Sequence, residues 1–187
     1  YSEVIKTASS ALEKAGARSE DWSMLLIEAL MTVGNYADAH AALTNGLARN
    51  NRSIRLRWAG QDVARFNGQP GMAKEYLEEI GTLVRARPTF YSEPPDFVVV
   101  GRMALGVGAD PKDVMARVFE PLQKSAPEYR EIYLTRGELA LSKHDFDLAA
   151  KAFAAGLKQH EDDPDLHYGM ALAFQNGDRE QIGRAHV

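Results

Sequence analysis

The chain has 187 residues, of which 45% are hydrophobic and 26% are charged, and its formal net charge is -4 at pH 7. These values are typical of a folded globular protein and argue against intrinsic disorder, and the negative charge gives no general attraction to nucleic acid or anionic membranes. The sequence contains no cysteine, which excludes disulfides, thiolate metal sites and cysteine nucleophiles. No apolar run reaches the length of a membrane span, so we expect no membrane insertion. The composition does not determine the cellular compartment.

Hydrophobic periodicity predicts ten helices, over residues 2–15, 20–33, 36–49, 53–67, 70–87, 95–107, 111–124, 128–142, 145–160 and 164–176. Adjacent prolines in RPTFYSEPPD predict a loop over 87–96, because the residue before a proline avoids the helical region. Residues 177–181 are expected to begin a further helix. We expect one continuous domain over residues 1–181.

Both ends of the chain show signs of truncation. The sequence opens at Tyr1 instead of a methionine, so we expect the native start to lie before it. The last residues, 182–187, read IGRAHV, a peptide encoded within a widely used short-read sequencing adapter. We therefore interpret residues 182–187 as adapter read-through and exclude them from the native fold.

A repeated pattern runs along the chain with a spacing near 34 residues. Gly34 opens GNYADAHAALTNGL, and Gly68 follows 34 residues later. Weaker copies begin at Gly108 and Gly177. The copy starting after His144 has the same residue classes at the same offsets as the first copy. These matched positions are Asn35–Tyr36 with Asp145–Phe146, Ala39 with Ala149, Leu43 with Phe153, and Gly46–Leu47 with Gly156–Leu157.

Each copy predicts two helices joined by a tight turn. Glycine accepts the left-handed backbone that ends the first helix, and Asn35 or Asp145 caps the second helix. Small residues such as Ala39 and Ala149 allow the two helices to cross closely. A single helix pair of this size cannot bury its apolar face, so neighbouring pairs must stack.

This pattern resembles the tetratricopeptide repeat, which has the same period, the same turn residues and small residues at the same helix crossing. The resemblance covers about residues 1–181, most clearly 20–51 and 130–164. It implies an all-α, tetratricopeptide-like α-solenoid of stacked antiparallel helix pairs, about four to five repeats. The chain departs from the family pattern in two ways. The Leu-Gly pair of the first helix is present only loosely, as Arg136–Gly137 and Tyr168–Gly169. Asn51 also stands at a position where other copies end with a proline.

The resemblance implies that first helices line a peptide-binding groove. Carrying that geometry over by the repeat register places ten residues near the groove: Met24, Glu28, Met31, Trp58, Asp62, Arg65, Val98, Arg102, Leu134 and Glu138. Some family members hold a peptide carboxylate with Lys, Asn and Arg side chains on these helices. That basic set is not reproduced here, so such a ligand is not expected. Trp22 is expected to pack in the core.

The sequence contains no nucleophile-elbow GxSxG, no Walker loop and no HExxH motif. GVGAD, at 106–110, is interpreted as a repeat turn, because a dinucleotide loop requires a preceding strand. HEDDPDLH places His160 and His167 around four acidic residues, but seven residues across a turn do not assure convergence on a metal ion. Residues 49–65 carry five arginines and one acid, a basic segment of the kind that contacts acidic peptides or nucleic acid. The negative net charge of the chain favours a solvated helix face over nucleic-acid binding. We expect no cofactor, no metal and no nucleic-acid partner.

The sequence therefore predicts a non-catalytic scaffold that binds a protein or peptide. One alternative is a partner- or substrate-positioning repeat arm of a larger bacterial enzyme, such as a metallopeptidase, whose catalytic domain lies outside this chain. Another is a structural scaffold that self-associates through the exposed, truncated ends of the array.

Overall fold

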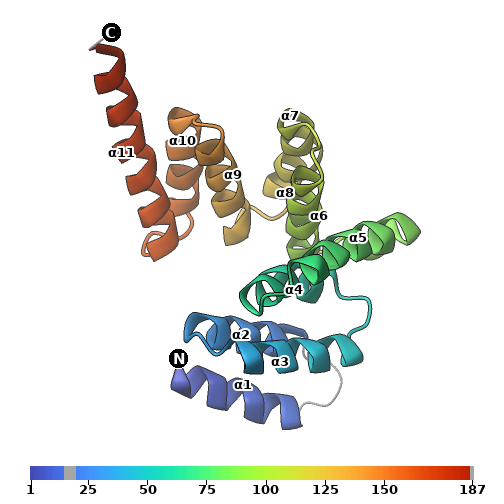
Figure 1. Cartoon of the computed structure of the whole chain (residues 1–187). Helices are drawn as coiled ribbons and strands as arrows, with labels where there is room; N and C mark the ends of the chain where they lie inside the picture. The colour runs from blue at the N-terminus through green and yellow to red at the C-terminus, as the bar shows by residue number, and fades with distance from the viewer. Residues whose placement is uncertain (15–19, 186–187) are drawn as a thin grey trace. The chain divides into compact units, whose positions relative to one another are not determined.

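The computed structural model describes residues 1–14 and 20–185, and the side chains of residues 1–14 and 20–177. The described residues form helices and turns without a strand (Figure 1). The chain divides into two compact units, Tyr1–Ser92 and Glu93–Val187. The division falls within the predicted loop. A single continuous array over residues 1–181 stays a prediction.

The described residues of unit 1, 1–14 and 20–92, form five helices and a short 3-10 turn. Consecutive helices pack against each other, and α2 also contacts α4 directly. Its core contains Leu26, Ile27, Leu43, Leu56 and Val63. The elements are α1 (Ser2–Lys14), α2 (Glu20–Thr32), α3 (Tyr36–Arg49), α4 (Ile54–Phe66), α5 (Pro70–Ala86) and η2 (Pro88–Phe90).

Unit 2 follows the same plan, with α9 packed against α6, α10 and α11. Its buried residues form two clusters, one around Phe119 and Ile132 and the other around Phe153 and Leu166. The elements are α6 (Pro94–Gly106), α7 (Pro111–Val114), the π-helical segment η3 (Met115–Phe119), α8 (Glu120–Ser125), α9 (Arg130–Ser142), α10 (Phe146–Leu157) and α11 (Pro164–Ala185).

The segments α7, η3 and α8 together form the predicted helix over 111–124. Glu120 donates its backbone N–H to the carbonyl of Met115, five residues earlier, which is the hydrogen bond of a π-helix. Pro121 follows and has no N–H to donate, so a regular α-helical ladder cannot continue through this point. The proline therefore accounts for the wider turn in the middle of this helix.

Four of the turns between paired helices have the same hydrogen bonds. In each, the backbone N–H of the residue after the left-handed position donates to a carbonyl five residues earlier, for example Asn35 to Leu30 at 2.9 Å and Asp145 to Ala140 at 3.0 Å. This is the Schellman motif that ends a helix with a left-handed residue. The left-handed residues are Gly34, Gly68, Gly108 and His144. The interpretation of GVGAD as a turn is confirmed.

The helix pairs α2–α3 and α9–α10 share local features at positions 110 residues apart. Asn35 and Asp145 each accept a hydrogen bond from the backbone N–H three residues later. Ala39 and Ala149 are both fully buried. The predicted pairing of helices is therefore confirmed for these two segments, and we use the offset of 110 residues to relate matched positions in the two units.

We expect His144→Gly to stabilise unit 2. His144 has a φ of 57°, whereas the equivalent turn residue is glycine in the other three turns. A left-handed backbone costs a side-chain-bearing residue about 1–2 kcal/mol, and glycine's greater freedom when unfolded offsets part of the gain. The variant should raise the free energy of unfolding by about 0.5–1 kcal/mol in a denaturant titration. Gly34→His, the reverse exchange in unit 1, should lower it, and a loss of stability in His144→Gly would contradict this account.

The observed helix ends lie within three residues of the predicted ones, except in α11. The sequence predicts an end at residue 176 and a turn at Gly177. This prediction is wrong, because α11 continues without interruption to Ala185. Gly177 has an α-helical conformation. A Cβ added to it would lie 3.5 Å from the Cβ of Phe146. Of the excluded residues 182–187, the last two lie outside the described residues.

Candidate binding surfaces

Six of the predicted groove residues lie on α2 and α4, the two adjacent first helices of unit 1. Met24 and Met31 are half-buried and pack against the core of the unit. Trp58 on α4 is also half-buried. Glu28, Asp62 and Arg65 are exposed. The structure therefore places apolar and charged members of the predicted set on two helices in direct contact.

The charged side chains of this surface are only partly paired. Arg65 donates to Asp62 at 2.9 Å, and both side chains are more than half exposed. An exposed pair one helical turn apart contributes little to stability, so Arg65 remains free to exchange partners. Glu28 forms no ion pair within the described part of the chain. A ligand can thus meet one unpaired acid and one loosely held arginine beside apolar contact area.

Unit 2 departs from the prediction. Leu134 and Val98 were expected near the groove, but they are 7% and 4% exposed and belong to the core clusters. These residues were assigned by repeat register alone, and the register does not show how far the neighbouring side chains close over a position. Leu134 is therefore a packing residue of unit 2.

Arg102 and Glu138 lie on α6 and α9 and are brought together by the fold. Arg102 donates to the hydroxyl of Thr135 at 3.1 Å and contacts the carboxylate of Glu138 at 3.4 Å. Desolvation is the main reason that the pKa of the Glu138 carboxyl is raised, and the positive charge of Arg102 acts to lower that pKa. The Glu138 side chain is 61% exposed, so solvent screening leaves this shift little effect on stability. In unit 2 these two predicted groove residues contact each other.

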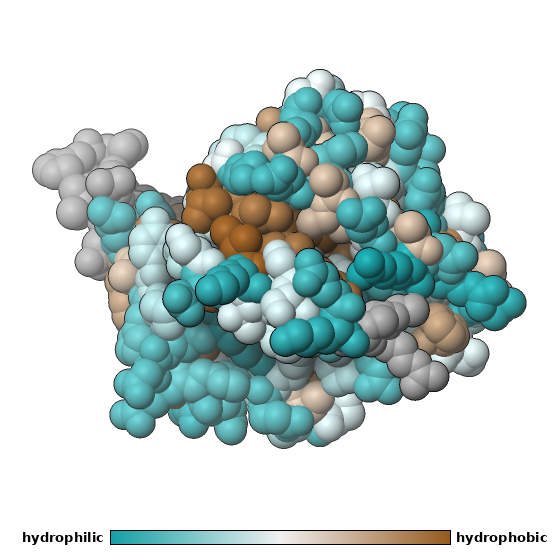
Figure 2. Space-filling model, turned by 90° about the horizontal axis from the view of Figure 1, so that it is seen from below, coloured by the Kyte–Doolittle hydropathy of each residue, from teal (hydrophilic) through white to brown (hydrophobic). Residues whose placement is uncertain are grey.

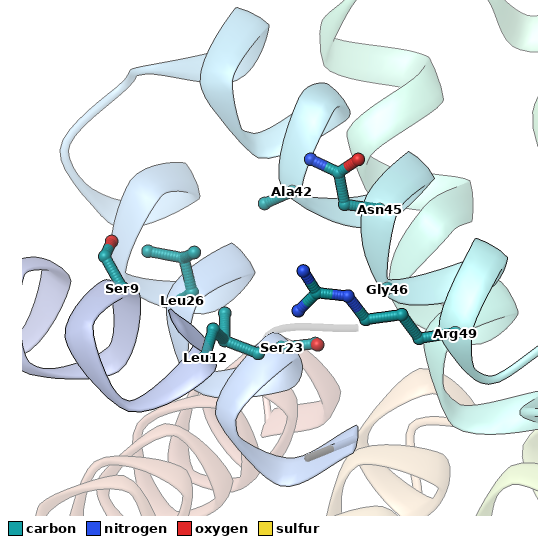
Figure 3. Close-up of a pocket in the computed structure, with 8 residues that line it drawn as sticks. All are labelled: Ser9, Leu12, Ser23, Leu26, Ala42, Asn45, Gly46 and Arg49. Carbon is teal, nitrogen blue, oxygen red and sulfur yellow. The ribbon is translucent and has the colours of Figure 1, made fainter. Parts of the chain in front are cut away.

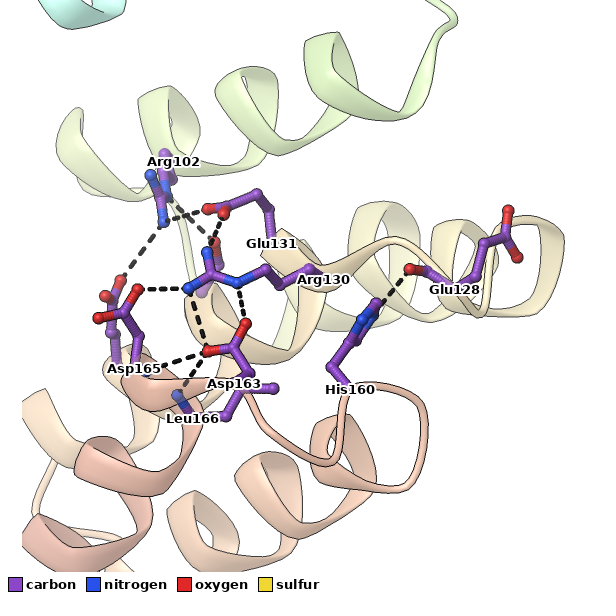
Figure 4. A network of polar contacts seen from close by, with 10 residues as sticks. Arg102, Glu128, Arg130, Glu131, His160, Asp163, Asp165 and Leu166 are labelled. Carbon is purple, nitrogen blue, oxygen red and sulfur yellow. Dashed lines mark hydrogen bonds and ion pairs between the residues drawn. The ribbon is translucent and has the colours of Figure 1, made fainter. Parts of the chain in front are cut away.

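An ion-pair network joins the starts of α9 and α11 (Figure 4). The guanidinium of Arg130 hydrogen-bonds to the carboxylates of Asp163, Asp165 and Glu131. Asp163 also accepts the backbone N–H of Leu166 at 3.0 Å and so caps α11. The hydrogen bond from Arg130 is the main reason that the pKa of Asp163 falls from 3.8 to about 2. The network fixes two neighbouring first helices to each other.

The equivalent junction in unit 1 has the opposite polarity. Glu20 occupies the position of Arg130, Ser53 that of Asp163, and Arg55 that of Asp165. Ser53 donates to Glu20 at 2.6 Å and caps α4 through Leu56 at 2.9 Å. Arg55 pairs with Asp21 at 2.8 Å. The same contact between helix starts is therefore made twice, with acid and base exchanged.

Two exposed apolar residues on α2 were missed by the sequence prediction. Trp22 was expected in the core, but it is 36% exposed, and Leu25 is 37% exposed. The residues equivalent to Trp22 are Leu56 and Ile132, which are fully buried. α4 packs on both α2 and α3, and α9 packs on α6 and η3, whereas α1 is the one described helix before α2 on which α2 packs. Hydrophobic periodicity within a short stretch of sequence does not reveal this difference in exposure.

The two histidines of HEDDPDLH are engaged separately. His160 Nε2 lies 2.8 Å from the backbone oxygen of Glu128, and His167 Nε2 lies 2.7 Å from that of Glu161. Among the side chains of residues 1–14 and 20–177, no group of three potential metal ligands comes together.

Hydrophilic side chains cover most of the face in Figure 2, and hydrophobic side chains gather in one part of it. None of the helices within the described ranges combines the length and apolar character needed to cross a bilayer. No protein-family model matches this sequence, and a search of curated proteins finds no similar sequence.

Proposed function

We propose that this chain is a non-catalytic scaffold that binds an extended protein or peptide segment through the first-helix face of unit 1. The observation that carries the proposal is the adjacency of α2 and α4, which places half-buried Met24, Met31 and Trp58 beside exposed charges. Aromatic and arginine side chains dominate binding energy at interfaces, and methionine adapts to varied contacts. The binding residues proposed are Met24, Glu28, Met31, Trp58, Asp62 and Arg65.

The repeated helix pairs support a tetratricopeptide-like α-solenoid as the architecture that carries this face. Four turns share one hydrogen-bonding pattern, and Ala39 and Ala149 allow the close crossing that such repeats use. Paired helices held by a common core present a surface that is formed before the ligand arrives. Little conformational entropy is then lost by the receptor on binding, so a few good contacts suffice.

A peptide display library, panned on the purified chain, tests the proposal. We expect enriched peptides to bind Trp58→Ala at least about tenfold more weakly than the parent chain, as for a hot-spot side chain. The matched control is Tyr168→Ala, because Tyr168 is equivalent to Trp58 and is 66% exposed in unit 2. Fluorescence polarisation of labelled peptides gives both affinities, and circular dichroism shows that each variant remains folded.

Three results would reject the proposed face. The first is that the library gives no more enriched peptides than it gives on an unrelated helical protein. The second is that the enriched peptides bind Trp58→Ala and Met24→Ala as tightly as they bind the parent chain. The third is that binding is lost only in Tyr168→Ala. Glu28→Gln, at an exposed position, provides a further variant that leaves the core untouched.

A further inference from the structure

A small hollow lies between α1, α2 and α3 (Figure 3), and none of its lining residues belongs to the set proposed for peptide binding. Its volume is about 170 Å³, enough for a ligand of a few heavy atoms. The lining residues come from all three helices and are Ser9, Leu12, Ser23, Leu26, Ala42, Asn45, Gly46 and Arg49.

The hollow has an identifiable origin in the repeat. In unit 2, Tyr133 lies against Gly156, where an added Cβ would meet the Tyr133 Cβ at 2.7 Å. In unit 1 a Cβ added to the equivalent glycine, Gly46, would meet the Ser23 Cβ at 3.2 Å. Tyr133 is 3% exposed, and its hydroxyl donates to the backbone carbonyl of Pro127. Unit 1 therefore has a much smaller side chain beside the equivalent glycine, and that side chain, Ser23, lines the hollow.

The hollow contains a cation without an anion. Arg49 forms no ion pair or side-chain hydrogen bond with the described residues, and its guanidinium extends across the hollow in Figure 3. Ser9 and Asn45 likewise have no side-chain hydrogen bond to the described part of the chain. Residues 15–19, AGARS, contain no carboxylate and so bring no acid to pair with Arg49. Arg49, Ser9 and Asn45 are therefore available donors on one lining.

Leu12 and Leu26 add apolar area across from the Arg49 guanidinium, with Ser9 beside Leu26 and Ala42 beside Asn45 (Figure 3). We propose that this hollow binds a small carboxylate with a short apolar body, held by Arg49 at its anionic end and by Leu12 and Leu26 at the other. Either a free short-chain acid or the side chain of a glutamate in a partner presents this chemistry.

The lining favours a carboxylate over other small ligands. A planar guanidinium matches two carboxylate oxygens in a bidentate pair, and the hydroxyl and amide donors add directional contacts. A phosphate carries more charge than a single arginine neutralises, and it has no apolar part to cover the leucines. A neutral alcohol of the same size would leave Arg49 without a counter-ion.

The test is a titration of the ¹⁵N-labelled full chain with sodium butyrate, followed by amide chemical shifts against sodium chloride at equal ionic strength. We expect saturable shifts at Ser23, Asn45 and Gly46, with a dissociation constant of about 1 mM, typical of so small a ligand. Arg49→Gln introduces the residue type that unit 2 has at the equivalent position, Gln159. This variant should bind butyrate at least about tenfold more weakly. Ser23→Tyr should abolish binding by filling the hollow.

Parallel titrations with sodium phosphate and with a blocked glutamate peptide separate the sources. Preference for butyrate indicates a free acid, and preference for the peptide indicates a carboxyl side chain of a partner. The proposal is overturned if no saturable shift appears with either carboxylate, if phosphate binds more tightly than both, or if Arg49→Gln binds as well as the parent. Since Arg49 is exposed, that variant retains the fold even where Ser23→Tyr does not. Trp58→Ala should leave these shifts unchanged, so failure here and failure of peptide binding are distinguishable.

Discussion

Gly137→Ala is expected to destabilise unit 2 by about 2 kcal/mol, although alanine is the better helix former. Gly137 lies on α9, and a Cβ there would approach the ring of Phe153 to 2.3 Å. The ring cannot move away, because an added Cβ at Gly169 on α11 would meet the same ring at 2.5 Å. Phe153 is fully buried between two glycines on neighbouring first helices. The added methyl must therefore displace a helix.

Unit 1 shows how the same position accepts a larger side chain. The equivalents of Gly137 and Phe153 are Ile27 and Leu43, which are both buried. Unit 1 thus combines a smaller residue on the second helix, Leu43, with a larger residue on the first helix, Ile27. Phe153→Leu should therefore rescue Gly137→Ala, and the double variant should be more stable than the sum of the two single changes by about 1–2 kcal/mol.

Denaturant titration of the parent, the two single variants and the double variant measures this coupling. Gly71→Ala serves as the control, because Gly71 is helical and has nothing within 4 Å of an added Cβ. That change should be neutral or stabilise by up to about 1 kcal/mol. Additive effects of Gly137→Ala and Phe153→Leu would show that the two positions do not compete for the same space.

The turns and helix ends of this protein were predictable because their causes are local. Gly34 and Asn35 determine the end of one helix and the start of the next through hydrogen bonds that span five residues or fewer. Gly68 and Gly108 act in the same way. His144 has the same left-handed backbone, and the sequence located its turn only through the capping Asp145.

The candidate surfaces were harder to predict because burial depends on residues far away in the sequence. Leu134 and Trp22 have ordinary helical spacing, but the first is covered by its neighbours and the second is not. The Phe153 contact requires knowing that α9 and α11 lie on either side of α10. The end of α11 was placed at Gly177 because the repeat period was extended one copy too far.

Arg130→Glu is expected to lower the free energy of unfolding by about 2–4 kcal/mol, because it places a fourth negative charge beside Asp163, Asp165 and Glu131. The Asp163 side chain is only 10% exposed, so solvent screens the repulsion poorly. Lys74→Glu is the matched control. It breaks the exposed pair with Glu78, whose side chains are 79% and 68% exposed, and should cost no more than about 0.5 kcal/mol.

The difference between Arg130→Glu and the parent should depend on pH in a defined direction. The folded pKa of Asp163 is about 2, below the 3.8 of the free group, so its ionised form is stabilised by folding. Its contribution is fully present above about pH 4 and is lost as the pH falls toward about 2. The stability gap between the two proteins should therefore narrow through this window, as measured by denaturant titrations at fixed pH values.

The opposite polarity of the unit 1 junction supplies a rescue. Arg130→Glu combined with Asp163→Ser and Asp165→Arg reproduces Glu20, Ser53 and Arg55 at their equivalent positions. Serine is also a good helix cap, so α11 keeps its N-terminal hydrogen bond. We expect the triple variant to return to within about 1 kcal/mol of the parent. Recovery would mean that either set of side chains can hold the two helix starts together. If the triple variant is no more stable than Arg130→Glu alone, Arg130 stabilises unit 2 through contacts that unit 1 does not have.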